Sequence, residues 1–134
     1  MEKNTSYAVH KIQFAEREIS LISSVCTEVL YGFKLNDNER EILGSIELGM
    51  TFSNKIDDFL KKTKKHYEIK LSLDEVTFIR NAIIVVMIRL NKHNLYFTHM
   101  GFHLSDCLNL LNRVSGMPRI FGDTEVGLRN WTTV

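Results

Sequence analysis

The sequence lacks most of the features that would place it in a special class of protein. It has one proline and two cysteines in 134 residues, and its formal net charge is +1. Two cysteines without a paired short spacing favour free, buried thiols over a disulfide scaffold. The balanced charge means that no global field draws the protein onto nucleic acid or an anionic membrane. No apolar run reaches the length of a membrane span, and no apolar export segment follows the initial methionine. We expect a cytoplasmic protein with no membrane partner.

The sequence is 44% apolar and 25% charged, a composition typical of a globular and largely helical chain. A chain of this length can bury about two-thirds of its unfolded surface in one domain. The sequence therefore predicts a single domain over residues 1–134 that needs no disulfide bond or other covalent cross-link for stability.

An internal repeat organises most of this domain. The segment Ile12 to Leu60 reappears in degenerate form as Ile69 to Asn112, and a shift of about 57 residues superposes apolar positions while polar ones differ. After a length change of about five residues, Leu48 to Ser53 meets Met100 to Ser105. We predict a mainly α fold with short β-strands (α+β), built by tandem duplication of a strand, long helix, short helix and helix. The repeats cover about 11–60 and 68–113, and a tail follows over 114–134.

Local patterns place the elements of each copy. Residues 11–14 and 68–71 alternate polar with apolar, as short half-buried strands do. Ser72 with Glu75 forms a capping box, so a long helix is expected over about 73–90, with its counterpart over about 17–33. The uninterrupted apolar run 83–88 predicts that the second of these helices is central.

The shorter helices are predicted from capping residues. Asn36 caps a short helix, and Gly49 and Gly101 are expected to end short helices. Ser53 and Ser105 are expected to begin the last helix of each copy.

Motifs that carry chemistry are scarce. There is no phosphate-binding glycine loop, no Gly-x-Ser-x-Gly turn, no His-Glu-x-x-His and no Cys-x-x-Cys. His99, His103 and Cys107 lie at four-residue intervals that could align zinc ligands on one helix, but Gly101 interrupts that helix and the other copy has no equivalent. A nucleophilic Cys107 with His103 as base is disfavoured because a packed helix face raises the thiol pKa. We therefore predict no catalytic residues, no bound zinc and no cofactor.

A family resemblance rests on the second copy. The run 68–82, which contains Arg80-Asn81-Ala82, and the aromatic segment Tyr96 to Phe102 with Leu104 and Ser105 resemble small bacterial immunity proteins of polymorphic-toxin and contact-dependent-inhibition loci. The resemblance covers about a third of the chain well, and Thr98-His99-Met100 stands where an arginine is expected. It implies a non-catalytic protein that binds and neutralises a cognate toxin in the cytoplasm, with a nuclease as one possible toxin.

The partner surface is expected where the copies diverge most. Residues 36–47 carry four carboxylates opposed by Arg40, an acidic face suited to the basic groove of a nuclease. The aromatic tail is next in line as an interface anchor. The predicted partner-binding residues are Asp37, Glu39, Glu41, Glu47, Phe121 and Trp131.

Two other classes of function stay open. The basic run 61–66 would suit a nucleic-acid-linked regulator or adaptor, although it lacks the interleaved aromatic residues of a stacking platform, so we do not expect nucleic acid as the main partner. A small enzyme comes third. The sequence leaves open the oligomeric state, the identity of the toxin and the role of the tail.

Overall fold

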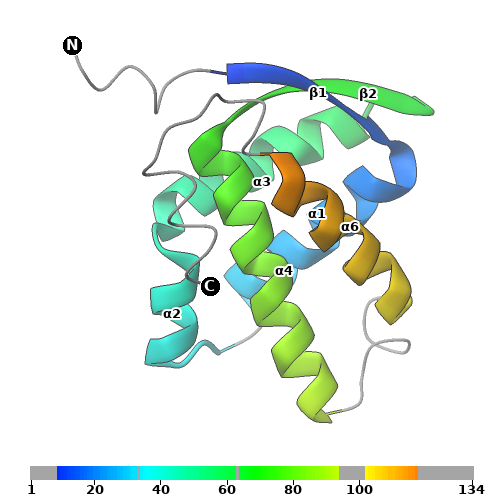
Figure 1. The fold of residues 1–134 in the computed structure, drawn as a ribbon. Helices are drawn as coiled ribbons and strands as arrows, with labels where there is room; N and C mark the ends of the chain where they lie inside the picture. The colour runs from blue at the N-terminus through cyan, green and yellow to red at the C-terminus, as the bar shows by residue number, and fades with distance from the viewer. Residues whose placement is uncertain (1–8, 33, 63, 94–101, 118–134) are drawn as a thin grey trace.

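The computed structural model describes residues 9–32, 34–62, 64–93 and 102–117, in which helices pack beneath a two-stranded antiparallel sheet (Figure 1). The fold is α+β and mainly helical. Its elements in chain order are β1 (Val9–Ala15), α1 (Glu16–Thr27), the π-helical turn η2 (Glu28–Gly32), α2 (Asp37–Leu43), α3 (Ile46–Leu60), β2 (His66–Ser72), α4 (Leu73–His93) and α6 (Leu104–Gly116).

The sheet is a ribbon with one buried face. β1 and β2 pair in the register Ile12 with Ile69, and each strand alternates exposed with buried residues. The buried face carries Ile12, Phe14, Tyr67, Ile69 and Leu71. Because side chains alternate along a strand, this pattern presents every second residue to the helices and leaves the other face to solvent. Both segments predicted as strands are confirmed.

α4 lies at the centre of the helical layer, as the sequence predicts (Figure 1). The Ser72 hydroxyl accepts from Glu75 N at 3.1 Å, and Glu75 Oε1 accepts from Ser72 N at 2.9 Å, so the predicted capping box begins this helix. The Asn36 cap of α2 is confirmed in the same way. α4 buries residues on several sides because it contacts α1, α2, α3 and α6. Its buried residues include Val76, Phe78, Ile79, Ala82, Ile83, Val85 and Val86.

Three predicted helix boundaries are wrong. Gly49 and Ser53 do not separate two helices, because both lie inside the continuous helix α3 and are buried there. Gly44 ends the preceding helix instead, with a positive φ of 79° that suits glycine. The last helix begins at Leu104 behind His103 rather than at Ser105. Gly101 lies outside the described residues.

The first long helix is also shorter than predicted. α1 stays regular only to Thr27 and then widens into η2, so one turn of the expected helix has i to i+5 geometry. Nowhere in the described part of the chain is a helix both long and apolar enough to cross a membrane.

In each half of the chain a strand leads directly into a helix, and η2 and α2 then precede α3 in the first half. β1 leads into α1, which packs on α3, and β2 leads into α4, which packs on α6. α1 and α4 also contact each other (Figure 1). The two ends of the ribbon therefore have comparable surroundings, which can be compared residue by residue.

Candidate partner-binding pocket

The end of each strand is fixed by a glutamate on the helix that follows it. Glu75 Oε1 accepts from Ser72 N at 2.9 Å, and Glu18 Oε1 accepts from Ala15 N at 2.9 Å. Each carboxylate therefore satisfies a backbone donor at the N-terminus of its helix, where negative charge is favoured. Both glutamates are the third residue of their helix.

A basic side chain then joins each glutamate to the edge of the ribbon. Lys55 of α3 contacts Glu75 at 3.1 Å and donates to the Lys70 carbonyl. Arg113 of α6 pairs with Glu18 and donates to the Gln13 carbonyl. The two cations therefore occupy backbone acceptors of a sheet in which both strands are edge strands. The same set of contacts thus occurs at both ends of the ribbon. We call the set of Glu75, Ser72, Lys55 and Lys70 the Glu75 brace, and the set of Glu18, Ala15, Arg113 and Gln13 the Glu18 brace.

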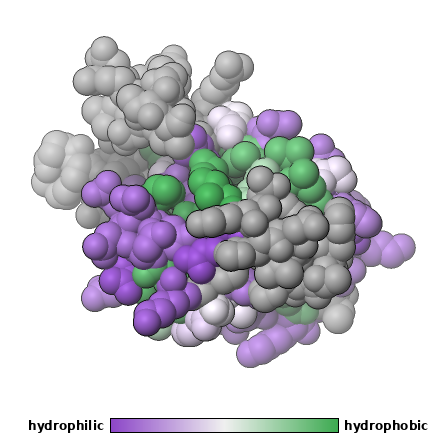
Figure 2. Space-filling view, turned by 90° about the horizontal axis from the view of Figure 1, so that it is seen from below, coloured by the Kyte–Doolittle hydropathy of each residue, from purple (hydrophilic) through white to green (hydrophobic). Residues whose placement is uncertain are grey.

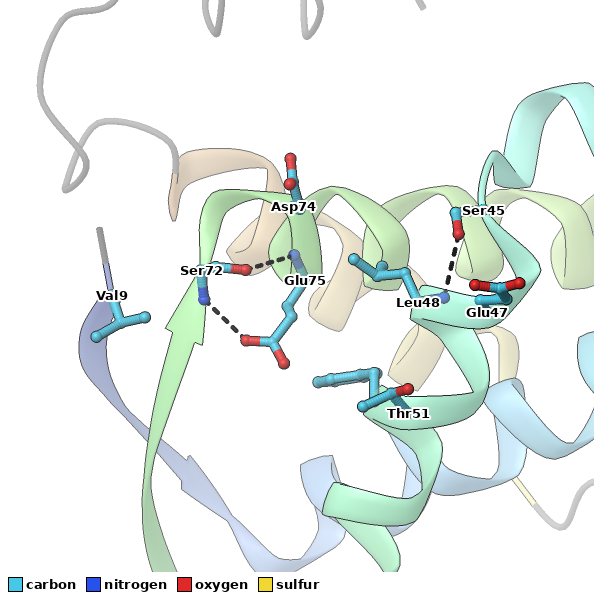
Figure 3. A pocket seen from close by; sticks show the side chains of 9 residues that line it. Val9, Ser45, Glu47, Leu48, Thr51, Ser72, Asp74 and Glu75 are labelled. Atoms are coloured by element: carbon cyan, nitrogen blue, oxygen red, sulfur yellow. Dashed lines mark hydrogen bonds between the residues drawn. The ribbon is translucent and has the colours of Figure 1, made fainter. Parts of the chain in front are cut away.

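Beside the Glu75 brace lies a pocket that we call the open pocket. It has a volume of about 590 Å³ and lies between the first turns of α3 and of α4 (Figure 3). In this view Leu48 points from α3 toward α4, and Glu75 bends back toward Ser72. The residues that line the open pocket are Val9, Ser45, Glu47, Leu48, Thr51, Phe52, Ser72, Asp74 and Glu75.

Beside the Glu18 brace lies a smaller pocket that we call the bridged pocket, with a volume of about 230 Å³. Arg17 of α1 donates to Asp106 of α6 at 3.0 Å and so joins the two helices that form it. The Arg17 guanidinium also lies 5.2 Å from the centre of the Phe102 ring, within cation–π range. The lining residues are Ala15, Arg17, Glu18, Leu21, Asp106, Asn109 and Leu110.

The open pocket combines unneutralised carboxylates with exposed apolar side chains. Asp74 and Glu47 are exposed, and among the described residues no cation lies within salt-bridge distance of either. Val9, which lines the pocket, is an exposed large hydrophobic residue, and Ile46 and Met50 of α3 are exposed outside the lining. An adjoining hollow, which shares Ser45, Leu48 and Asp74 with the pocket, adds Glu41 and Ile42. A mixed surface of this kind suits a basic and partly apolar ligand.

The structure separates the predicted acidic residues into different roles. Glu39 is 8% exposed and pairs with Arg89 of α4, whose Nε donates to it at 3.0 Å, and its Oε1 also accepts from Asn36 N in the capping box. Its carboxylate thus holds α2 on α4. Asp37 and Glu41 are exposed on α2. Hydrophilic residues gather at the left of Figure 2, the side on which α2 lies in Figure 1. Only Glu47 and Glu41 lie at the open pocket and its adjoining hollow.

The remaining predicted residues contribute less to this region. Phe121, Trp131 and His99 lie outside the described residues. His103 caps α6 and Cys107 is buried in the same helix, and no group of three potential metal ligands occurs within residues 9–32, 34–62, 64–93 and 102–117. Burial raises the Cys107 pKa, with a smaller contribution from Asp106, so the thiol is a poor nucleophile. The absence of zinc stays a prediction.

Sequence reasoning missed Asp74 as a site residue. Aspartate is common in the first turn of a helix, so position 74 does not stand out in the sequence. A signal was nonetheless present, because the repeat places Asp74 on Arg17 and so reverses the charge at the second residue of the long helix.

Basic residues gather at the opposite end of the ribbon. Lys61, Lys62, Lys64, Lys65 and His66 are all exposed between α3 and β2. The open pocket lies by contrast at the Val9 and Ser72 end. A strand of this length spans roughly 20 Å. The lysines at one end of the ribbon are therefore separated by about that distance from the carboxylates of the open pocket at the other end.

Comparisons with protein-family models, with curated proteins and with solved structures return no match.

Proposed function

We propose that this chain is a non-catalytic immunity protein that binds a cognate bacterial toxin in the cytoplasm and neutralises it. The observation that carries the proposal is the open pocket, where Asp74 and Glu47 stand beside exposed apolar side chains without a neutralising cation in the described residues. Such a surface is complementary to a basic partner. The resemblance of the second half to immunity proteins supplies the class of partner.

Occlusion of a toxin requires a stable scaffold rather than reactive groups. The braces at both ends of the ribbon and the buried pair of Glu39 with Arg89 hold the elements around the open pocket in place. Preorganisation of this kind favours tight binding because little side-chain freedom is lost on association.

We also infer that the scaffold arose by duplication of one strand–helix–helix unit. The matched braces support this inference, since Glu18, Gln13 and Ala15 each have a counterpart 57 positions later that makes the same contact. For the last helices the helix starts favour a shift of 58, which carries Ser45 onto His103. We therefore align residues 48–53 with residues 106–111, six positions further along the second copy than the alignment with 100–105.

Co-expression with the product of the adjoining reading frame tests the proposed function. If that product is a toxin, the chain should restore growth and elute with it as a stoichiometric complex. Normal toxicity and separate elution would contradict the proposal.

The role of the acidic surface is tested by charge reversal within that complex. The variant with Glu47→Lys and Asp74→Lys should fold normally, associate at least tenfold more slowly and show weaker salt dependence, because electrostatic steering is lost. The matched control reverses two exposed carboxylates near the basic end of the ribbon, Asp58→Lys and Glu68→Lys. An equal loss in both variants would indicate a general charge effect rather than a surface at the pocket.

A nucleic-acid-linked regulator is the second candidate, favoured by the exposed lysines at residues 61–65. Phosphate binding there would give an affinity that falls steeply with salt. Titration of duplex DNA and of single-stranded RNA at 50 and 200 mM salt separates the candidates, because the regulator predicts binding at 50 mM that weakens at 200 mM, whereas the immunity function predicts no binding at either concentration.

A further inference from the structure

The open and bridged pockets are built from the same positions of equivalent helices. Asp74 and Arg17 are the second residues of α4 and α1, while Leu48 and Asp106 are the third residues of α3 and α6. Both pockets lie beside a glutamate brace. The other matched lining pairs are Ser72 with Ala15, Glu75 with Glu18, Thr51 with Asn109, and Phe52 with Leu110.

The pockets differ in the group that joins their two helices. In the bridged pocket the Arg17 guanidinium reaches Asp106 at 3.0 Å and stacks on Phe102. In the open pocket an aspartate stands in the place of Arg17, and an apolar leucine stands in the place of Asp106. Among the described residues the Arg17 cation has no counterpart in the open pocket, and the carboxylate lies on the other helix, so a cation from elsewhere would complete the same arrangement.

We infer that the open pocket binds an arginine side chain of the partner, in the place that Arg17 takes in the bridged pocket. The inference rests on the proposed function and names the chemistry of its interface. A guanidinium presents several donors in one plane, which suits a pocket lined by carboxylates from two helices, Asp74 of α4 and Glu47 of α3. Its aliphatic stem can pack on Leu48 and Val9, as that of lysine can, so the planar set of donors is what favours arginine.

The size of the open pocket agrees with this occupant. Its volume of about 590 Å³ exceeds that of the bridged pocket, about 230 Å³, in which the Arg17 side chain itself forms part of the wall. Position 44 is a glycine, whereas Phe102 stacks on Arg17 at the matching place, so within the described residues this position offers no ring to a bound cation. The partner is expected to cover its arginine with its own surface.

The experiment titrates the isolated full chain with N-acetyl-arginine amide and follows backbone amides by NMR. Saturable shifts should centre on Glu47, Leu48, Thr51 and Asp74, and the neutral isostere N-acetyl-citrulline amide should bind at least tenfold more weakly. Equal shifts with both amides, or shifts centred on residues 61–66, would overturn the inference.

Two further arms fix the source of the arginine. Asp74→Asn should reduce the response to the arginine amide at least fivefold, whereas Asp37→Asn on exposed α2 should leave it unchanged. The same titration is run on a chain with Arg119→Gln and Arg129→Gln. A response that occurs only in that chain would assign the pocket to its own tail and overturn the assignment to a partner.

This titration needs no toxin, so its failure is distinguishable from failure of the proposed function. Growth protection without arginine binding rejects the pocket assignment alone. Arginine binding without protection rejects the immunity function alone.

Discussion

Gly49 allows α3 to approach the central helix, and its replacement by alanine should destabilise the protein. A Cβ atom built at this position lies 2.5 and 2.6 Å from two ring carbons of Phe78 and 3.3 Å from Leu30 Cδ2. Ordinary carbon contacts lie at about 3.5–4.0 Å, so the ring would have to shift by about 1 Å. Phe78 is 2% exposed and packs edge-on against Phe52 with centroids 6.2 Å apart, which blocks that movement.

The net effect is the difference between two opposing contributions. Alanine in a helix interior stabilises it by about 1 kcal/mol relative to glycine, whereas overpacking a filled core costs roughly 2–3 kcal/mol at such short contacts. Gly49→Ala should therefore lower the unfolding free energy by about 1–2 kcal/mol and the melting temperature by roughly 4–8 °C.

The matched control is Gly116→Ala at the end of α6, where an added Cβ meets nothing within 4 Å. This variant should leave the melting temperature unchanged or raise it slightly. Differential scanning calorimetry of both variants gives the comparison. A Gly49→Ala protein as stable as the wild type would refute the packing of α3 on Phe78, and with it the position of α3 beside the open pocket.

Three other predictions concern ionisable and reactive groups. The hydrogen bond from Arg17, and then that from the His103 backbone, lower the pKa of Asp106. The ionised Asp106 should therefore stabilise the folded protein fully above about pH 4, the range of an unfolded aspartate, and this contribution should be lost as the pH falls through the folded pKa. Urea midpoints at pH 7, 4 and 3 should therefore converge with those of Asp106→Asn at the acidic end, and a constant difference would contradict this. Burial raises the pKa of Cys26 to about 12 and also raises the pKa of Cys107. Iodoacetamide at pH 8 should therefore modify both thiols only after denaturation, and rapid modification of the native protein would contradict their burial. Glu39→Gln should cost about 2 kcal/mol because it breaks the pair that joins α2 to α4, whereas Glu41→Gln should change the urea midpoint little.

Local features of the fold could be predicted from the sequence. The strands, the start of α4 at Ser72 and the start of α2 at Asn36 follow from alternation and capping residues that act over three or four positions. The central place of α4 follows from its continuous apolar run. These features depend on short-range patterns that tertiary contacts did not override.

Features that depend on distant residues could not be predicted. Gly49 was interpreted as a helix end, but it serves the approach of Phe78, which is far along the chain. Glu39 was placed on the acidic surface because its neighbours are acidic, yet Arg89, fifty positions away, buries it in an ion pair. The open pocket was missed for the same reason, since Leu48 and Asp74 meet only when α3 lies against α4. Charge patterns along one helix do not indicate which carboxylates the fold neutralises.

The most direct test of the partner-binding account makes the open pocket resemble the bridged one. Asp74→Arg with Leu48→Asp should recreate the pair of Arg17 with Asp106, keep the fold and reduce toxin affinity at least a hundredfold by isothermal titration calorimetry, because the chain then supplies its own cation. The mirror-image control, Arg17→Asp with Asp106→Leu, opens the other pocket and should leave that affinity within threefold of the wild type. Undiminished binding by the first variant, with its fold intact, would contradict the account.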